Sequence, residues 1–227
     1  MKKKVLLLSL ICLLGACKAR QSASETFVQT EVTDSASVVF PAVFTSEPLP
    51  QEVLIRMRGV SYPEDADIAP EDLRYLRLSY VDFEGCDRTG EMVCNKAIAE
   101  DLLVIFRKLY EARYPIRSIR LIDDFGGSDE ASMEADNTSC FNYRKVSGMR
   151  KLSRHAYGMA VDINPLENPF VRGSGIRPSG AAAYADRSRS FPHKIDRNDL
   201  CYMLFREHGF AWGGAWKSAQ DYQHFEK

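Results

Sequence analysis

Two histidines and several carboxylates lie in two short segments of the C-terminal half of the chain. His155 precedes Asp162 by seven residues, and Asp221 precedes His224 by three, close to the last residue. Two imidazoles and one carboxylate, with a fourth position left for water, form a catalytic zinc arrangement. A second carboxylate beside that water can act as the general base. We therefore expect one Zn²⁺ held by His155, Asp162 and His224, with Asp221 as the base.

The spacing alone leaves a simpler interpretation open. Met159 to Ile163 alternate as a half-buried strand, which places the Asp162 carboxylate among apolar residues. A carboxylate buried without a partner costs several kcal/mol, so Asp162 is expected to have a cationic partner. That partner can be a metal ion, or it can be His155 in a plain ion pair, with Asp221 paired to a nearby lysine.

The elements that must position these residues are predicted from apolar spacing. A helix is expected over 95–113, where Pro115 prevents continuation, and a half-buried strand over 116–122. A second helix is expected over 198–208, and residues 53–55 are a candidate strand. A few helices among irregularly placed strands predict an α+β fold, with a small antiparallel sheet, flanking helices and the zinc site in a cleft. The expected inward faces are Ile98, Leu102, Ile105, Phe106 and Leu109 in the first helix, and Leu200, Met203 and Leu204 in the second, which Asp196 or Asn198 would cap.

The N-terminus is typical of an exported protein. Three lysines follow Met1, and an apolar run then ends in Leu-Gly-Ala before Cys17. This ending resembles the bacterial lipobox, which implies removal of residues 1–16 and lipidation of Cys17, an anchor to a membrane surface. Plain secretion with an incidental cysteine is the alternative. Residues 17–50, rich in Ser, Thr and Pro, are expected to be a flexible linker, and 51–227 the folded domain.

Composition narrows the functional classes. The chain has 227 residues, 30 Lys and Arg against 31 Asp and Glu, and 45% hydrophobic residues. This near-neutral charge provides no basic surface for nucleic acid, so no nucleic-acid partner is expected. No apolar stretch reaches the ~18 residues that a membrane-spanning helix needs.

The remaining cysteines suggest disulfides. Export places Cys86, Cys94, Cys140 and Cys201 where disulfides persist, and none belongs to a C-x-x-C zinc pair. Four cysteines allow three pairings. The preferred pairing is Cys86–Cys94, which closes a short loop, with Cys140–Cys201 joining distant parts of the domain.

The combined motifs resemble those of a known family. Ser153-x-His155-x-x-Gly-x-Ala-x-Asp162, then Trp-Gly-Gly at 212–214 and Asp221-x-x-His224-Phe-Glu, are similar to the M15 family of zinc D-Ala-D-Ala carboxypeptidases and L-Ala-D-Glu endopeptidases. The resemblance covers about half of the chain. It implies a D-Ala-D-Ala-peptidase-like (hedgehog-like) fold, the same three zinc ligands and the same base. It also implies that Arg144 polarises the scissile carbonyl and that Ser153 lies beside the site.

The resemblance implies hydrolysis of peptidoglycan stem peptides in the bacterial cell envelope, on its periplasmic side or at the outer membrane. Tyr157, Trp212 and Trp216 are candidate substrate contacts, and the arginine-rich stretch 172–189 is a candidate wall for substrate carboxylates. One position departs from the endopeptidase pattern, where Trp-Gly-Gly is commonly followed by Asp and here by Ala215. A non-catalytic zinc module that binds wall peptides or a protein partner is the alternative function.

Overall fold

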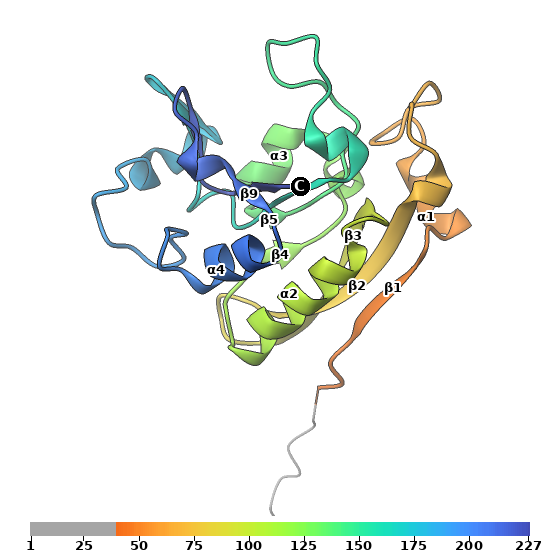
Figure 1. Cartoon of the computed structure of the whole chain (residues 1–227), viewed down its shortest axis with the longest axis horizontal. Coiled ribbons are helices and arrows are strands. Elements are labelled where there is room, and N and C mark those ends of the chain that lie inside the picture. The colour runs from red at the N-terminus through yellow and green to blue at the C-terminus, as the bar shows by residue number, and fades with distance from the viewer. Residues whose placement is uncertain (1–39) are drawn as a thin grey trace, which may run out of the picture. The chain divides into compact units, whose positions relative to one another are not determined.

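The computed structural model describes residues 40–227, in which short strands form four small sheets among a few helices (Figure 1). Three of the sheets are antiparallel, which confirms the predicted α+β class with small antiparallel sheets. The helices are α1 (Gln51–Met57), α2 (Ala99–Glu111), α3 (Asp129–Glu134) and α4 (Leu200–Glu207). The strands are β1 (Phe44–Pro48), β2 (Leu73–Val81), β3 (Asp87–Asn95), β4 (Ser118–Ile119), β5 (Asn137–Thr138), β6 (Ala160–Asp162), β7 (Phe170–Arg172), β8 (Gly175–Arg177), β9 (Ala211–Trp212), β10 (Gln220–Asp221) and β11 (His224–Glu226).

The first sheet has the order β1-β2-β3 and supports one side of the domain (Figure 1). β1 pairs antiparallel with β2, Phe44 opposite Leu78, inside the range predicted as linker, so the folded domain begins earlier than expected. Residues 53–55, predicted as a strand, lie in helix α1 instead. The reason is the spacing of the buried residues Val53, Leu54 and Met57, which face one side of a helix.

Helix α2 confirms the predicted helix over 95–113, with slightly shorter ends. It packs against β1, β2 and α4. The chain turns away at Arg113, whose φ of 56° is left-handed, two residues before Pro115. All five apolar residues expected on its inward face are buried in the main core: Ile98, Leu102, Ile105, Phe106 and Leu109.

Two other predicted elements are altered. The expected strand over 116–122 is reduced to β4, which pairs in parallel with β5, because the chain enters a 3₁₀ turn at Ile122–Phe125. The second helix exists as α4, but its N-cap is Asp199, whose carboxylate accepts hydrogen bonds from the next turn. The buried face consists of Cys201, Leu204 and Phe205, spaced i, i+3 and i+4, so Met203 is 48% exposed rather than inward.

The predicted disulfides are wrong, since all four of these cysteines are free. Cys86 is exposed just before β3 and Cys94 is buried near the other end of that strand. At ~3.3 Å per residue the two are separated by roughly 25 Å, far beyond the ~7 Å that a disulfide allows between Cα atoms. Cys140 and Cys201 share the main core as unpaired thiols, and burial raises their pKa well above the ordinary value.

Asp136 and Glu167 form a buried carboxyl pair outside the predicted site, with only 4% and 6% exposed. Asp136 accepts a hydrogen bond from the Leu166 N–H at 2.9 Å. Burial, and then the neighbouring Asp136, raise the pKa of Glu167 to about 8. Glu167 therefore keeps its proton at neutral pH in the folded protein, whereas in an unfolded chain it is ionised above ~4.3.

Replacing Glu167 is expected to change how stability depends on pH. The folded state binds more protons than the unfolded state between about 4.5 and 8, so stability falls as pH rises through this window. Glu167→Gln, which keeps the shape without the charge, should melt higher than the unsubstituted protein at pH 8.5, with the difference shrinking at pH 5. A gain of about 1 kcal/mol corresponds to a Tm increase of about 2–4 °C. Thermal unfolding across pH measures the difference in Tm, with the exposed Glu64→Gln as the control. Parallel profiles of Tm against pH for Glu167→Gln and the unsubstituted protein would contradict the prediction.

The signal segment and Cys17 lie outside the described residues, so the predicted processing and lipidation stay predictions. Among residues 40–227, no helix has the length and apolar character required to cross a bilayer.

Candidate active site

His155, Asp162 and His224 meet in one buried cluster. His155 Nε2 lies 3.1 Å from His224 Nδ1 and 3.2 Å from Asp162 Oδ2, and His224 Nδ1 lies 3.0 Å from Asp162 Oδ1. One ligand atom from each residue lies within 4.8 Å of the others. Two imidazole nitrogens and a carboxylate oxygen, converging in this way, are a donor set suited to Zn²⁺.

Three local structures bring the cluster together. In the sheet ordered β6-β11-β9, Asp162 lies directly opposite His224 in an antiparallel pair. His155 comes from the 3₁₀ turn Arg154–Tyr157, which the Ser153 side chain caps by accepting the His155 N–H. Gly158 ends this turn at φ 63°, and a side chain there would meet the Asn95 backbone nitrogen at 2.6 Å. The Ser-x-His-x-x-Gly pattern is thus a capped turn that leads into β6.

The other nitrogen of each imidazole has a fixed partner. His155 Nδ1 lies 2.6 Å from the Cys140 carbonyl oxygen, and His224 Nε2 lies 3.1 Å from Glu226 Oε2. In a neutral imidazole, a proton on each of these nitrogens leaves lone pairs on His155 Nε2 and His224 Nδ1, the nitrogens that face Asp162. Such outer partners fix the tautomer and raise the basicity of metal-binding imidazoles. The sequence analysis assigned no role to Glu226, although it stands two residues after His224 on the same strand, where side chains share a face.

Glu226→Gln is expected to weaken metal binding while leaving the fold intact. A side-chain amide can still occupy the position but has no negative charge to strengthen the imidazole, and loss of such a partner typically costs ~10–100-fold in affinity. Competition with a chromogenic chelator measures the change. Glu207→Gln, an exposed carboxylate paired with Lys108, is the matched control. Unchanged affinity in Glu226→Gln would show that this hydrogen bond does not tune the site.

The charges of the cluster suit a cation. Burial alone would raise the pKa of Asp162, but His155 and His224 outweigh it, so the pKa falls well below its usual range. For His224, burial lowers the pKa, yet the hydrogen bonds with Asp162 and Glu226 raise it to about 10. The Asp162 carboxylate is therefore stabilised in its ionised form, the form that coordinates metal.

Asp221 lies next to the cluster with a carboxylate oxygen available. Its Oδ1 is buried and has no hydrogen-bond partner. Burial raises the pKa of Asp221 to about 7, with His224 opposing and Asp162 adding to the rise. A cation bound at the cluster would lower this value and favour the carboxylate. Gly213 makes the approach possible, because a side chain there would meet the Asp221 carbonyl oxygen at 2.7 Å and His224 Cβ at 3.2 Å.

Arg144 reaches the same cleft from the preceding loop. Its guanidinium pairs with Asp129 of α3 at 2.8 Å, while its Nε is buried without a partner. The positive charge of Arg144 also lowers the pKa of Asp221, so the two side chains interact electrostatically. An arginine held by a carboxylate on one side, with an unused donor on the other, is placed to bind a carbonyl or carboxylate oxygen.

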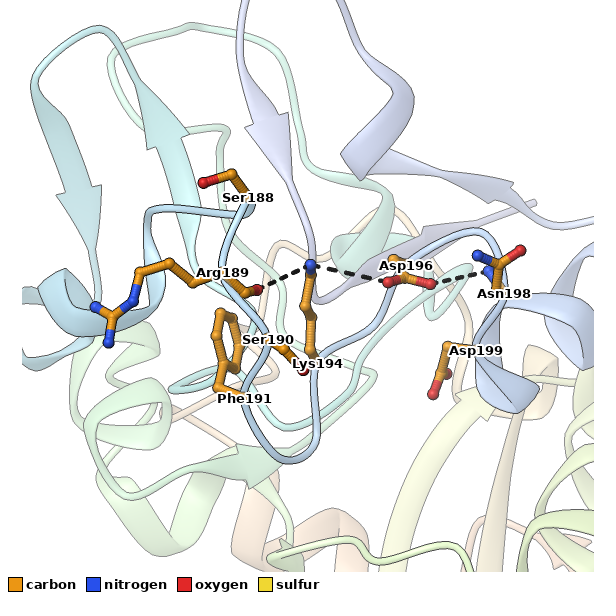
Figure 2. Close-up of a pocket in the computed structure, with 8 residues that line it drawn as sticks. All are labelled: Ser188, Arg189, Ser190, Phe191, Lys194, Asp196, Asn198 and Asp199. Carbon is orange, nitrogen blue, oxygen red and sulfur yellow. Dashed lines mark hydrogen bonds and ion pairs between the residues drawn. The ribbon is translucent and has the colours of Figure 1, made fainter.

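The cleft around these residues has a volume of about 640 Å³. Buried polar atoms without partners concentrate here: Arg144 Nε, Asp221 Oδ1 and Gln223 Oε1 all belong to residues that line it. Since buried polar groups in proteins are nearly always paired, this concentration indicates a place prepared for a ligand. A separate pocket of about 450 Å³ lies around Lys194, where the lysine amine is bonded to backbone oxygens and faces Asp196 (Figure 2).

The four candidate substrate contacts divide evenly. Ser153 and Trp216 line the cleft, and the Trp216 ring lies 5.3 Å from that of His224. Tyr157 and Trp212 do not line it. Trp212 is in the core, where its indole N–H donates to the Tyr222 carbonyl at 2.9 Å. The spacing of the tryptophans does not separate them, but the fold does: Trp212 lies in β9, and Trp216 follows the 3₁₀ turn after that strand.

A cluster that could hold a metal ion, an adjacent acid and an arginine within one cleft are the groups that a metal-dependent hydrolase uses. Comparison with known families agrees: residues 147–227 match the family model described as D-alanyl-D-alanine carboxypeptidase, one of the M15 peptidases. The match covers about a third of the chain, and it includes the cluster and Asp221 but begins after Arg144. No curated protein and no solved structure gives a significant match to the chain.

Proposed function

We propose that this protein is a zinc-dependent peptidase that hydrolyses peptidoglycan stem peptides, as a D-Ala-D-Ala carboxypeptidase or an L-Ala-D-Glu endopeptidase. The observation that carries the proposal is the convergence of His155, Asp162 and His224 beside Asp221, within one cleft. The family match supports peptide hydrolysis, and the donor set supports zinc. We extend the proposal to the family's D-Ala-D-Ala-peptidase-like (hedgehog-like) fold.

In the proposed hydrolysis, the residues of the site have different roles. His155, Asp162 and His224 would hold the metal, which when bound supplies Lewis-acid polarisation and a lowered pKa for water. Asp221, with its unpartnered Oδ1, would accept the proton of the attacking water and deliver it to the departing amine. Arg144 provides fixed positive charge where the oxyanion develops, an effect worth ~2.7–4 kcal/mol for a single donor in comparable sites.

We further propose that the protein acts at the cell envelope, anchored through a lipid on Cys17. The support is the sequence of the first seventeen residues, with its three lysines, apolar run and Leu-Gly-Ala-Cys ending. Because β1 begins at Phe44, residues 18–43 would connect the lipid to the folded domain. Peptidoglycan is exposed in the same compartment, so the proposed location and substrate agree.

Incubation of the full chain, purified in detergent, with defined muropeptides tests the proposal. We expect cleavage that stops when a chelator is added and resumes when Zn²⁺ is restored, and the mass of the products identifies the bond. Loss of a terminal alanine would indicate the carboxypeptidase, and release of a peptide after the first alanine the endopeptidase. Binding of muropeptides without any chelator-sensitive cleavage would overturn the proposal in favour of a zinc-containing binding module.

A further inference from the structure

The acidic residues that line the cleft are already committed to partners or to the proposed chemistry. Asp129 pairs with Arg144, and Glu226 bonds to His224. Asp162 belongs to the cluster, and Asp221 is the proposed base. The cleft therefore has no spare carboxylate to neutralise additional positive charge on its walls.

Positive charge is nevertheless present on those walls. Lys151 and Arg172 both line the cleft, both are exposed, and neither has an ion pair or side-chain hydrogen bond among the described residues. The other lining cations differ, because Arg177 pairs with Glu130 and Arg154 lies close enough to Glu226 to lower the pKa of that carboxyl. Two unpaired cations thus face a cleft whose acids are all in use.

Two different hairpins present these cations. Lys151 stands on the loop after Arg144, which folds back on itself through the hydrogen bond from the Val146 N–H to the Lys151 carbonyl oxygen at 2.9 Å. Arg172 ends β7, which pairs with β8 on one side and with β10, the strand of Asp221, on the other. Lys151 and Arg172 therefore stand on separate elements around the cluster. A bound peptide would have positive charge available at two points outside the reacting bond.

We propose that Lys151 and Arg172 make the cleft selective for peptides that carry, near the scissile bond, a free carboxylate outside the peptide linkages, an inference that rests on the proposed function. Arginine binds carboxylates through paired N–H groups, and lysine adds a point charge. A substrate in which that carboxylate is amidated has the same shape and the same scissile bond but offers these cations no charge. The cleft thus distinguishes substrates that carry the free carboxylate from substrates in which it is amidated. Arg189 belongs to the same arginine-rich stretch, but it lines the separate pocket shown in Figure 2 and takes no part in this selectivity.

The test compares two stem peptides that differ only in one group, D-glutamate or D-isoglutamine at the second position. Cleavage and equilibrium binding are measured for the full chain and for Arg172→Gln, Lys151→Gln and the double variant. Arg189→Gln is the matched control. We expect the full chain to prefer the carboxylate peptide by about tenfold in KM and Kd, with similar kcat. The preference should shrink with added salt, fall in each single variant and disappear in the double variant.

Four outcomes distinguish this inference from the proposed function. Equal affinity of the full chain for the two peptides, or a preference that survives in the double variant, would overturn the selectivity. A preference lost equally in Arg189→Gln would overturn the assignment to the cleft. Selective binding without cleavage of either peptide would keep the inference and reject the peptidase function.

Discussion

Asp221→Asn is expected to abolish peptide hydrolysis and to leave the metal content unchanged. The amide keeps the size of the side chain but cannot accept the proton of the attacking water, and general bases contribute ~10²–10⁴-fold to rate. Because Asp221 is adjacent to the cluster and not one of its three convergent residues, the donors that hold the metal remain. We expect kcat to fall by about 1,000-fold or more, with zinc near one equivalent by elemental analysis.

The stability of the Asp221→Asn variant adds a second readout. The Asp221 carboxylate is buried with an unpartnered oxygen, and its pKa is raised to about 7 by that burial. Replacing it with a neutral amide removes a charge that is costly to bury, so the metal-free variant should be at least as stable as the unsubstituted protein above pH 7. Asp196→Asn, in the separate pocket, is the control of the same chemistry. Full activity in Asp221→Asn would exclude this carboxylate as the base.

The sequence was most informative where a pattern has one physical solution. The inward face of α2 follows from 3.6-residue spacing that ends before a proline, and every residue assigned to it is buried. The strand around Val161 was predicted, but not its burial: all three residues of β6 are buried, so it is not the half-buried strand that alternation predicted. Its buried aspartate required a cationic neighbour, which the structure supplies as His155 and His224. In both cases local spacing already determines which side chains share a face.

Features that depend on contacts between distant segments were not predictable in this way. β1 is a strand because β2 offers it an edge, not because of its own composition. Cys86 and Cys94 are close in sequence, but an extended strand separates them, so a short spacing did not mean proximity. In the site, the bond from His155 to the Cys140 carbonyl oxygen joins residues fifteen positions apart through backbone geometry that no motif records.

The arginine-rich stretch illustrates the same distinction within a single segment. Arg172 lines the cleft, whereas Arg187 is directed to the Glu167 and Ile195 carbonyl oxygens and serves the packing of its own loop. Composition alone gives these residues one common interpretation as a basic surface. The fold separates them, because β7 is held beside β10 and the later residues are not.

His224→Ala is expected to lose both the metal and the activity. The substitution removes one of three donors and leaves the buried Asp162 carboxylate with only His155 beside it. A buried charge deprived of a partner typically destabilises a protein by 3–5 kcal/mol. We therefore expect less than a tenth of an equivalent of zinc, no measurable hydrolysis and a lower Tm than that of the chelated, unsubstituted protein.

The control for His224→Ala is His208→Ala, which removes an imidazole bound to Asp101 that does not line the cleft. That variant should keep its zinc and its activity.

Acidification provides an independent test of the same assignment, because metal-binding imidazoles must be neutral and protons compete for their lone pairs. Zinc affinity should fall as pH drops, and in His224→Ala this dependence should be lost together with tight binding. Full zinc occupancy in His224→Ala would show that His224 is not a zinc ligand. The metal would then no longer explain why β11 pairs with β6 in the register that places His224 opposite Asp162.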